Sequence, residues 1–226
     1  MPLLPILLGA TIHAASLAHA MCDRGGPQPI GFHSRGFSYV AEVFPAKARR
    51  NTDAQPRVYV YEVGYPGAQW RVDAKRLWTS ALPVMPEAAL VSMAGHVVML
   101  DEHYQAGGDH ALVLFAPDGR LVKSFTLEQL LGRTNLARVE YSDCGRLWRK
   151  GAAFYFSQGP SARLYVVLAG GSAVEIELAT GALRRGTVRD FDTLREIVAQ
   201  QFPNELAEPW PLSLRFSSLT DMLPFQ

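Results

Sequence analysis

The chain has 226 residues, of which 48% are apolar and 19% are charged, and its formal net charge is +1. This near-neutral balance argues against a nucleic-acid partner and against electrostatic attachment to an anionic membrane, because both need a strongly basic surface. The length suits one domain with a sizeable core.

The first twenty residues predict a signal peptide. They contain no Asp, Glu, Lys or Arg, and their apolar run is followed by small residues that end in Ala18-His19-Ala20, a sequence that suits a signal peptidase. The run is too short to span a bilayer as a helix of the mature protein. We therefore expect cleavage after Ala20, a single domain over residues 21–226, no stable membrane span, and a periplasmic or secreted location. An uncleaved anchor or a misplaced start is the alternative, because no Lys or Arg precedes the apolar run.

Two cysteines, Cys22 and Cys144, are present. In an oxidising compartment such a pair is expected to form one disulfide, which would stabilise the fold by about 4–5 kcal/mol on the chain-entropy model. The alternative is a nucleophilic thiol at Cys144, but no histidine lies near it in the sequence to act as the base.

A weak repeat with two intervals of 52 residues runs through the middle of the chain. The repeated stretches are "RVYVYEVGYPGAQWRV" from Arg57, "ALVLFAPDGRLVKSF" from Ala111 and "RLYVVLAGGSAVEIEL" from Arg163, with turn glycines Gly67, Gly119 and Gly171. In each, an apolar run leads through a glycine turn into a second strand, which is the pattern of a tight β-hairpin.

Another candidate strand precedes each hairpin. These strands are "GFSYVAEVF" from Gly36, "GHVVMLDEH" from Gly95 and "GAAFYFSQG" from Gly151, and the short runs "AALVS" from Ala88 and "LARVEYS" from Leu136 precede two of them. We therefore predict a mainly β fold of three four-stranded antiparallel propeller-like units, over about residues 30–80, 88–132 and 136–185. Since closed propellers take four to eight blades, the units would form an incomplete propeller or stacked sheets.

The remaining region, residues 187–226, predicts a C-terminal helix and a tail. Apolar residues from Phe191 to Phe202 recur at helical spacing, Asp190 or Asp192 is a candidate N-cap, and Pro203 follows the predicted end. The tail around Leu212 to Phe216 alternates and could add one strand. A second, short helix is predicted over Thr126 to Gly132, with Gly132 as its C-cap.

The elements "SRGFSYVAEVFP", "GDHALVLFAPDGRLVKSFTLEQLL" and "YSDCGRLWR" resemble a group of uncharacterised exported bacterial proteins with propeller-like β repeats. The resemblance covers about residues 34–180. It implies a β-repeat fold and an exported location, and it implies no substrate, because its motifs are turns and strand entries. The first unit departs from the pattern, since Pro66-Gly67 replaces the Asp-Gly turn.

The most chemically suggestive stretch is "LDEHYQAGGDHALVLF", which begins at Leu100. If its hairpin folds back near the two glycines, Asp101, His103, Asp109 and His110 could meet and bind zinc or manganese. The spacing matches no established metal motif, and polar residues are the usual composition of a hairpin loop. We favour the loop interpretation, which involves no cofactor.

Aromatic residues offer a second kind of site. Eight of them could line a carbohydrate or peptide groove or could pack inside the protein: Tyr59, Tyr61, Tyr65, Trp70, Trp78, Tyr104, Trp148 and Trp210. We expect Trp78 and Trp148 to be packed. Tyr65 and Tyr104 lie in predicted loops and are the better candidates for contact with a ligand.

No nucleophile elbow, phosphate loop or dinucleotide fingerprint is present. We therefore predict an exported, non-catalytic binding or interaction module whose partner is a small molecule, a glycan or a protein. Its predicted ligand-binding residues lie in the inter-strand loops: Tyr65, His103, Tyr104, Asp109 and His110. The alternative is a metal-dependent hydrolase or lyase that uses Asp101, His103, Asp109 and His110.

Overall fold

The structure is a computed structural model of the 226-residue chain. It describes residues 10–12, 27–34, 38–47, 54–64, 73–102, 107–142, 145–149, 152–157, 161–168 and 171–201. The chain divides into two compact units, one formed by Ala20–Leu147 and the other by Met1–His19 with Trp148–Gln226. Each unit is described by itself.

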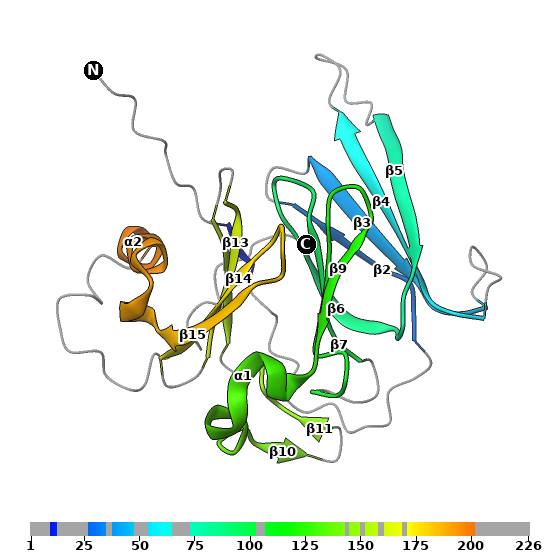
Figure 1. The fold of residues 1–226 in the computed structure, drawn as a ribbon. Helices are drawn as coiled ribbons and strands as arrows, with labels where there is room; N and C mark the ends of the chain where they lie inside the picture. Colours follow the sequence, from blue (N-terminus) through cyan, green and yellow to red (C-terminus); the bar gives the residue numbers. More distant parts are fainter. Residues whose placement is uncertain are drawn as a thin grey trace, which may run out of the picture. The chain divides into compact units, whose positions relative to one another are not determined.

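Three antiparallel sheets, each containing four strands in chain order, confirm the predicted mainly β fold (Figure 1). The first contains β2 (Ile30–His33), β3 (Tyr39–Phe44), β4 (Arg57–Gly64) and β5 (Asp73–Ala81). The second contains β6 (Pro86–Val91), β7 (Val97–Glu102), β8 (Leu112–Phe115) and β9 (Leu121–Phe125). The third contains β12 (Ala153–Phe156), β13 (Arg163–Val167), β14 (Ser172–Glu177) and β15 (Leu183–Thr187).

The first two sheets belong to the unit Ala20–Leu147 and share one hydrophobic core. In β4, buried and partly exposed side chains alternate from Arg57 to Tyr61, so one face of the sheet points into the core. This core combines side chains of both sheets: Ala41, Val43, Val58, Val60, Trp78, Val97, Met99, Val113 and Phe115. The indole of Trp78 lies 5.8 Å from the Phe115 ring, measured between centroids.

Helix α1 (Leu127–Leu136) follows β9, and its N-cap is Thr126, the first residue of the predicted helix. The Thr126 hydroxyl accepts a hydrogen bond from the Gln129 amide, and the Gln129 side chain accepts one from the Thr126 amide. Gly132 has φ +75° and interrupts the helix where the sequence predicts its end, but helical residues continue to Leu136. Gly132 therefore leaves the helical conformation as predicted, but the helix ends four residues later than predicted, at Leu136.

The strand predicted from Leu136 was wrong over most of its length. Leu136 completes α1, and only β10 (Tyr141–Ser142) is extended; it pairs with β11 (Gly145–Arg146) in a short hairpin. Leu and Ala are strong helix formers, so "LA" at the start of this run extends α1. The third sheet obtains its fourth strand, β15, after the predicted hairpin.

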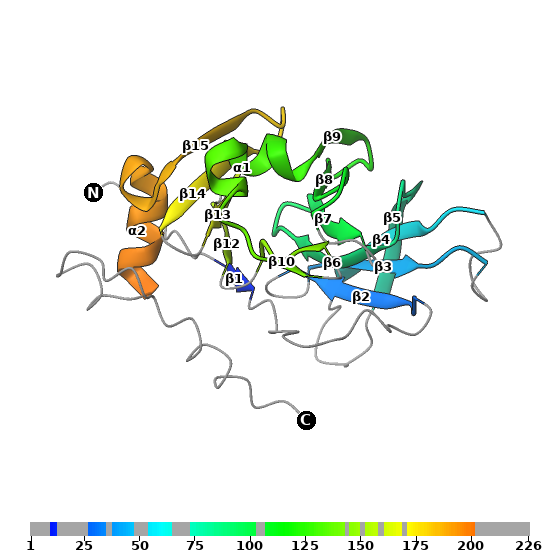
Figure 2. The ribbon, with the colours of Figure 1, turned by 90° about the horizontal axis from the view of Figure 1, so that it is seen from below.

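In the other unit, β1 (Ala10–Ile12) pairs with the outer edge of β12 and makes this sheet five-stranded (Figure 2). A 3₁₀ turn, η2 (Val188–Asp190), leads into α2 (Asp192–Gln201), which confirms the C-terminal helix. One face of the sheet packs with η2 and α2 in a core made of Ala153, Tyr155, Tyr165, Val167, Ala173, Val188, Phe191, Leu194, Ile197 and Val198.

The tight turns have the predicted backbone. Gly119 and Gly171 have φ values of +86° and +80°, which only glycine adopts without a steric cost. Gly67, the third repeated glycine, lies outside the described residues, as does the predicted strand of the tail. Among the helices of the described residues, neither has the length and hydropathy needed to cross a membrane.

Candidate functional site

Asp101, a residue of the predicted metal site, closes the loop between β7 and β8. Its side chain is 1% exposed, its φ is +56°, and its Oδ1 accepts a hydrogen bond of 2.9 Å from the Gly107 amide. The Asp101 amide also donates to the Ala111 carbonyl at 3.1 Å. This geometry gives the carboxylate a structural task, since it satisfies a backbone donor across the loop.

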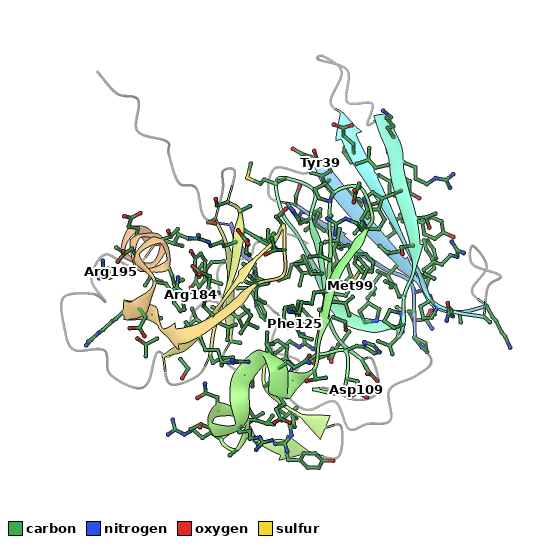
Figure 3. All side chains as sticks on the ribbon, in the orientation of Figure 1. Tyr39, Met99, Asp109, Phe125, Arg184 and Arg195 are labelled. Carbon is green, nitrogen blue, oxygen red and sulfur yellow. The ribbon has the colours of Figure 1, made fainter. Side chains whose placement is uncertain are left out.

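The other predicted residues of this loop are placed separately. Asp109 is exposed at the end of the β6–β9 sheet (Figure 3), whereas His110 is half-buried. His110 Nδ1 lies 3.0 Å from the Ser124 hydroxyl on β9. This hydrogen bond fixes the imidazole against the sheet.

The metal alternative stays a prediction, because His103 lies outside the described residues, as do Tyr65 and Tyr104. Within the described part of the chain, no group of three or more His, Cys, Asp or Glu side chains is placed to hold an ion. The predicted disulfide is likewise untested, since Cys22 and Cys144 are also outside the described residues.

Gly107 brings this loop against α1 and β11. A Cβ atom at Gly107 would lie 2.6 Å from Leu127 Cδ2 and 2.9 Å from Arg146 Cβ, and its φ is +74°. No other residue fits this position without displacing a neighbour. The close approach places Gly107 beside Arg146 of the β10–β11 hairpin, which the sequence repeat did not indicate.

The β10–β11 hairpin presents an exposed aromatic side chain. Tyr141 is 72% exposed, and the Arg146 guanidinium lies 5.8 Å from the centroid of its ring, within cation–π range. Arg146 is itself held, because its Nη1 donates to the Leu136 carbonyl at 3.2 Å. We call the Tyr141–Arg146 pair, together with the adjoining Gly107 loop that carries Asp109 and His110, the loop–hairpin surface.

Sequence reasoning predicted Asp109 and His110 as ligand-binding residues but missed Tyr141 and Arg146, because β10 and β11 have only two residues each. The available signal was local: Tyr141 and Arg146 flank a short polar segment with a glycine, as in a small hairpin. The approach of the Gly107 loop to Arg146 could not be predicted, since it is a contact between segments distant in sequence.

A second polar cluster, also missed, lies on the sheet of the other unit. Glu175 is 6% exposed, and its two carboxylate oxygens lie 3.6 Å from Arg163 Nη1 and 3.2 Å from Arg184 Nη1. The Arg184 guanidinium also lies 5.4 Å from the Phe191 ring, between β15 and α2 (Figure 3). Tyr165, Glu175 and Arg184 are cross-strand partners in one row of the sheet.

Burial raises the pKa of the Tyr165 phenol, so this group is neutral over the physiological range. The ring also packs against Phe191, with 6.0 Å between the centroids. We interpret the Arg163–Glu175–Arg184 cluster as structural. The buried Glu175 carboxylate lies on the sheet face that α2 covers, and the two arginines compensate its negative charge.

The two tryptophans predicted to be packed are buried. Trp78 is 9% exposed and Trp148 is 3% exposed. The Trp148 ring meets Phe154 edge to face, with centroids 6.1 Å apart. Trp70 and Trp210 lie outside the described residues. Tyr59 and Tyr61, by contrast, are half-buried on β4.

No protein-family model matches the chain, and no curated protein matches it. Among solved structures, the chain is similar to a crystal structure of HIRA covering its residues 644–1017, with 11% sequence identity and a TM-score of 0.33. The match covers 76% of this chain and 57% of that chain. At this TM-score the likeness supports no conclusion about fold or function.

Proposed function

We propose that the chain is a non-catalytic interaction module that acts outside the cytoplasm and contacts a protein partner through the loop–hairpin surface. The observation that carries this proposal is the exposed Tyr141 ring, held by the anchored guanidinium of Arg146. Tyrosine and arginine dominate the energetics of protein interfaces, and an exposed pair that is already ordered loses little entropy on binding.

The surroundings of Tyr141 support an interface. Asp109 adds an exposed carboxylate, and His110 is oriented by Ser124. The loop that contacts Arg146 through Gly107 thus supplies polar groups of the kind found at the rim of a protein interface.

Photo-crosslinking in the host cell tests the proposed function. A benzoylphenylalanine replaces Tyr141 in one variant and Leu121, which is 54% exposed on β9 of the same unit, in a matched control. We expect a discrete protein adduct from position 141, weakened by Arg146→Ala, and no such adduct from position 121. No adduct at position 141, or the same adducts from both positions, would contradict the proposal.

The proposed location has its own test. If the chain is exported and cleaved after Ala20, the mature protein starts at Met21 without β1, and its two cysteines are paired. We expect intact mass spectrometry of the protein from the cell envelope to show this start, and alkylation without reductant to label no thiol. A chain that retains Met1, with two alkylated cysteines, would contradict export.

A further inference from the structure

Two neighbouring rows of side chains lie in the middle of the outer face of the β2–β5 sheet, opposite the shared core. Cross-strand pairing joins Gly31, Glu42, Tyr59 and Thr79 in one row. It joins His33, Val40, Tyr61 and Arg76 in the next. Because side chains two apart on a strand share a face, Tyr59 and Tyr61 stand next to each other in the middle. We call these eight residues the tyrosine face.

The tyrosine face is open at Gly31. A Cβ atom added there would meet nothing within 4 Å, and the residue does not need glycine's left-handed conformation. Gly31 and His33 are exposed on β2, as are Arg76 and Thr79 on β5, while Tyr59 and Tyr61 are half-buried between them. The absence of a side chain at Gly31 therefore leaves space beside Glu42, its cross-strand neighbour.

Two charged groups on this face have no partner among the described residues. Neither the half-buried Glu42 carboxylate nor the exposed Arg76 guanidinium makes a hydrogen bond or an ion pair among the residues that the structure describes. His33 Nδ1 lies 3.1 Å from the Ser34 carbonyl and so donates to it, which makes Nε2 the acceptor of that tautomer. The face thus combines two aromatic rings with an anionic and a cationic group.

A β-bulge determines which side chain accompanies Tyr61. Val60 pairs with Trp78, but Tyr61 pairs with Arg76, so the register shifts and Leu77 is the extra residue. Without this shift Leu77 would stand beside Tyr61 and Arg76 would point to the opposite face. Bulges often reorient a side chain at a functional position. Here the bulge keeps a cation on the tyrosine face.

We propose that the tyrosine face binds an oligosaccharide that contains a carboxylate-bearing sugar. Sugar rings present C–H groups that stack on aromatic rings and hydroxyl groups that bond to charged side chains. Tyr59 and Tyr61 supply the stacking surface, Glu42 accepts hydrogen bonds from hydroxyls, and Arg76 pairs with the sugar carboxylate beside Tyr61. This site is separate from the loop–hairpin surface and does not depend on the proposed protein partner.

The charges suit this occupant. Any ligand that covers the face must offer a partner to both Glu42 and Arg76, because leaving a charge desolvated and unpaired is costly. A saccharide offers a hydroxyl or carboxylate to each of them and keeps the rim in water. A protein contact at this face is therefore the competing outcome of the experiment.

The test uses the full exported chain on an array of printed neutral and carboxylate-bearing oligosaccharides, followed by calorimetry with the best acidic oligosaccharide and its uncharged analogue. We expect saturable binding that prefers the acidic form. Tyr61→Ala should weaken it about ten-fold, as for a central contact residue. Gly31→Leu should weaken it similarly by filling the open space, with an unchanged unfolding midpoint that shows the sheet is intact.

Two further variants separate the causes. Arg76→Gln should remove the preference for the acidic form while neutral binding persists, and Tyr141→Ala should leave both affinities unchanged. The proposal is overturned if no printed oligosaccharide binds saturably, or if binding survives both Tyr61→Ala and Gly31→Leu. It is also overturned if neutral and acidic forms bind equally, or if a benzoylphenylalanine at position 59 crosslinks a protein while no oligosaccharide binds.

Discussion

The β2–β5 and β6–β9 sheets have the same four-stranded antiparallel order, yet their exposure to solvent differs. In β4, buried and partly exposed residues alternate from Arg57 to Tyr61, whereas every residue of β8 and all of β7 except Glu102 are buried. The first sheet therefore has one packed face and one accessible face, and the central strands of the second are packed on both. Only the first can offer a broad sheet surface to a ligand.

This difference teaches that a shared strand order does not determine where a binding surface lies. The central strands of the second sheet can offer a binding surface only at their ends, where the Gly107 loop approaches the β10–β11 hairpin. The first sheet can present it across a face. Four predictions test this comparison.

The largest effect is expected from comparing one glycine in each sheet. At Gly119, in the β8–β9 turn, φ is +86° and an added Cβ would lie 2.7 Å from the Trp78 ring. Gly119→Ala should cost about 2–4 kcal/mol from backbone strain and overpacking. Gly31→Ala, on the open face of β2, should change the free energy of unfolding by less than about 0.5 kcal/mol. Urea unfolding measures both, and equal losses would refute the difference in packing.

The end of β7 should be the next most sensitive position. Asp101→Ala removes the acceptor of the Gly107 amide and places alanine at φ +56°. The expected loss in unfolding free energy is about 1.5–3 kcal/mol. Asp101→Asn should lose clearly less, since its amide oxygen can accept the bond and asparagine tolerates this backbone conformation. Equal losses of unfolding free energy for the two variants would show that the hydrogen bond from the Gly107 amide does not stabilise the fold.

One substitution of the same chemistry can compare the two outer faces directly. Val98→Thr introduces a hydroxyl on β7 at a fully buried position, and Val40→Thr introduces it on the tyrosine face of β3. The first should cost about 1–2 kcal/mol and the second about 0.5 kcal/mol or less. Denaturant midpoints give both values. A larger loss at position 40 would show that the tyrosine face is covered.

The smallest effect concerns pH and the turn between β6 and β7. Burial lowers the pKa of His96 from its ordinary value of 6.5, so its neutral form is favoured in the folded state. The free energy of unfolding therefore keeps its full value above about pH 6.5. It decreases as the pH falls below this value, because His96 binds a proton more readily in the unfolded chain than in the folded one. The urea midpoint of the native protein should fall between pH 7.5 and pH 5.5, and His96→Gln should make this fall slightly smaller. An unchanged pH dependence would contradict this.

Much of the fold could be predicted from the sequence, because its turns carry strong signals. Asp118-Gly119 and Gly171 mark hairpins whose alternating strands allow one register. The strand predicted from Leu136 failed because helix propensity and the packing of α1 decide a short ambiguous run. The extra strand β1 could not be predicted, since its pairing with β12 is a contact distant in sequence.

The candidate sites could be predicted only in part. Tyr59 and Tyr61 were recognised as possible stacking residues, but their outward direction follows from the register with β3. Arg76 could not be selected over Leu77, because the bulge that exchanges them leaves no clear sequence signal. The Tyr141–Arg146 pair depends on a two-residue hairpin that is shorter than any reliable pattern.

An NMR titration tests the central comparison most directly. The ¹⁵N-labelled chain is titrated with the acidic oligosaccharide that binds best on the array. The account predicts saturating shifts of amides in β2 to β5 near Gly31, Glu42 and Tyr61, with no comparable shifts in β7 or β8. Shifts confined to the Gly107–His110 loop, or an absence of shifts in β2 to β5, would contradict it.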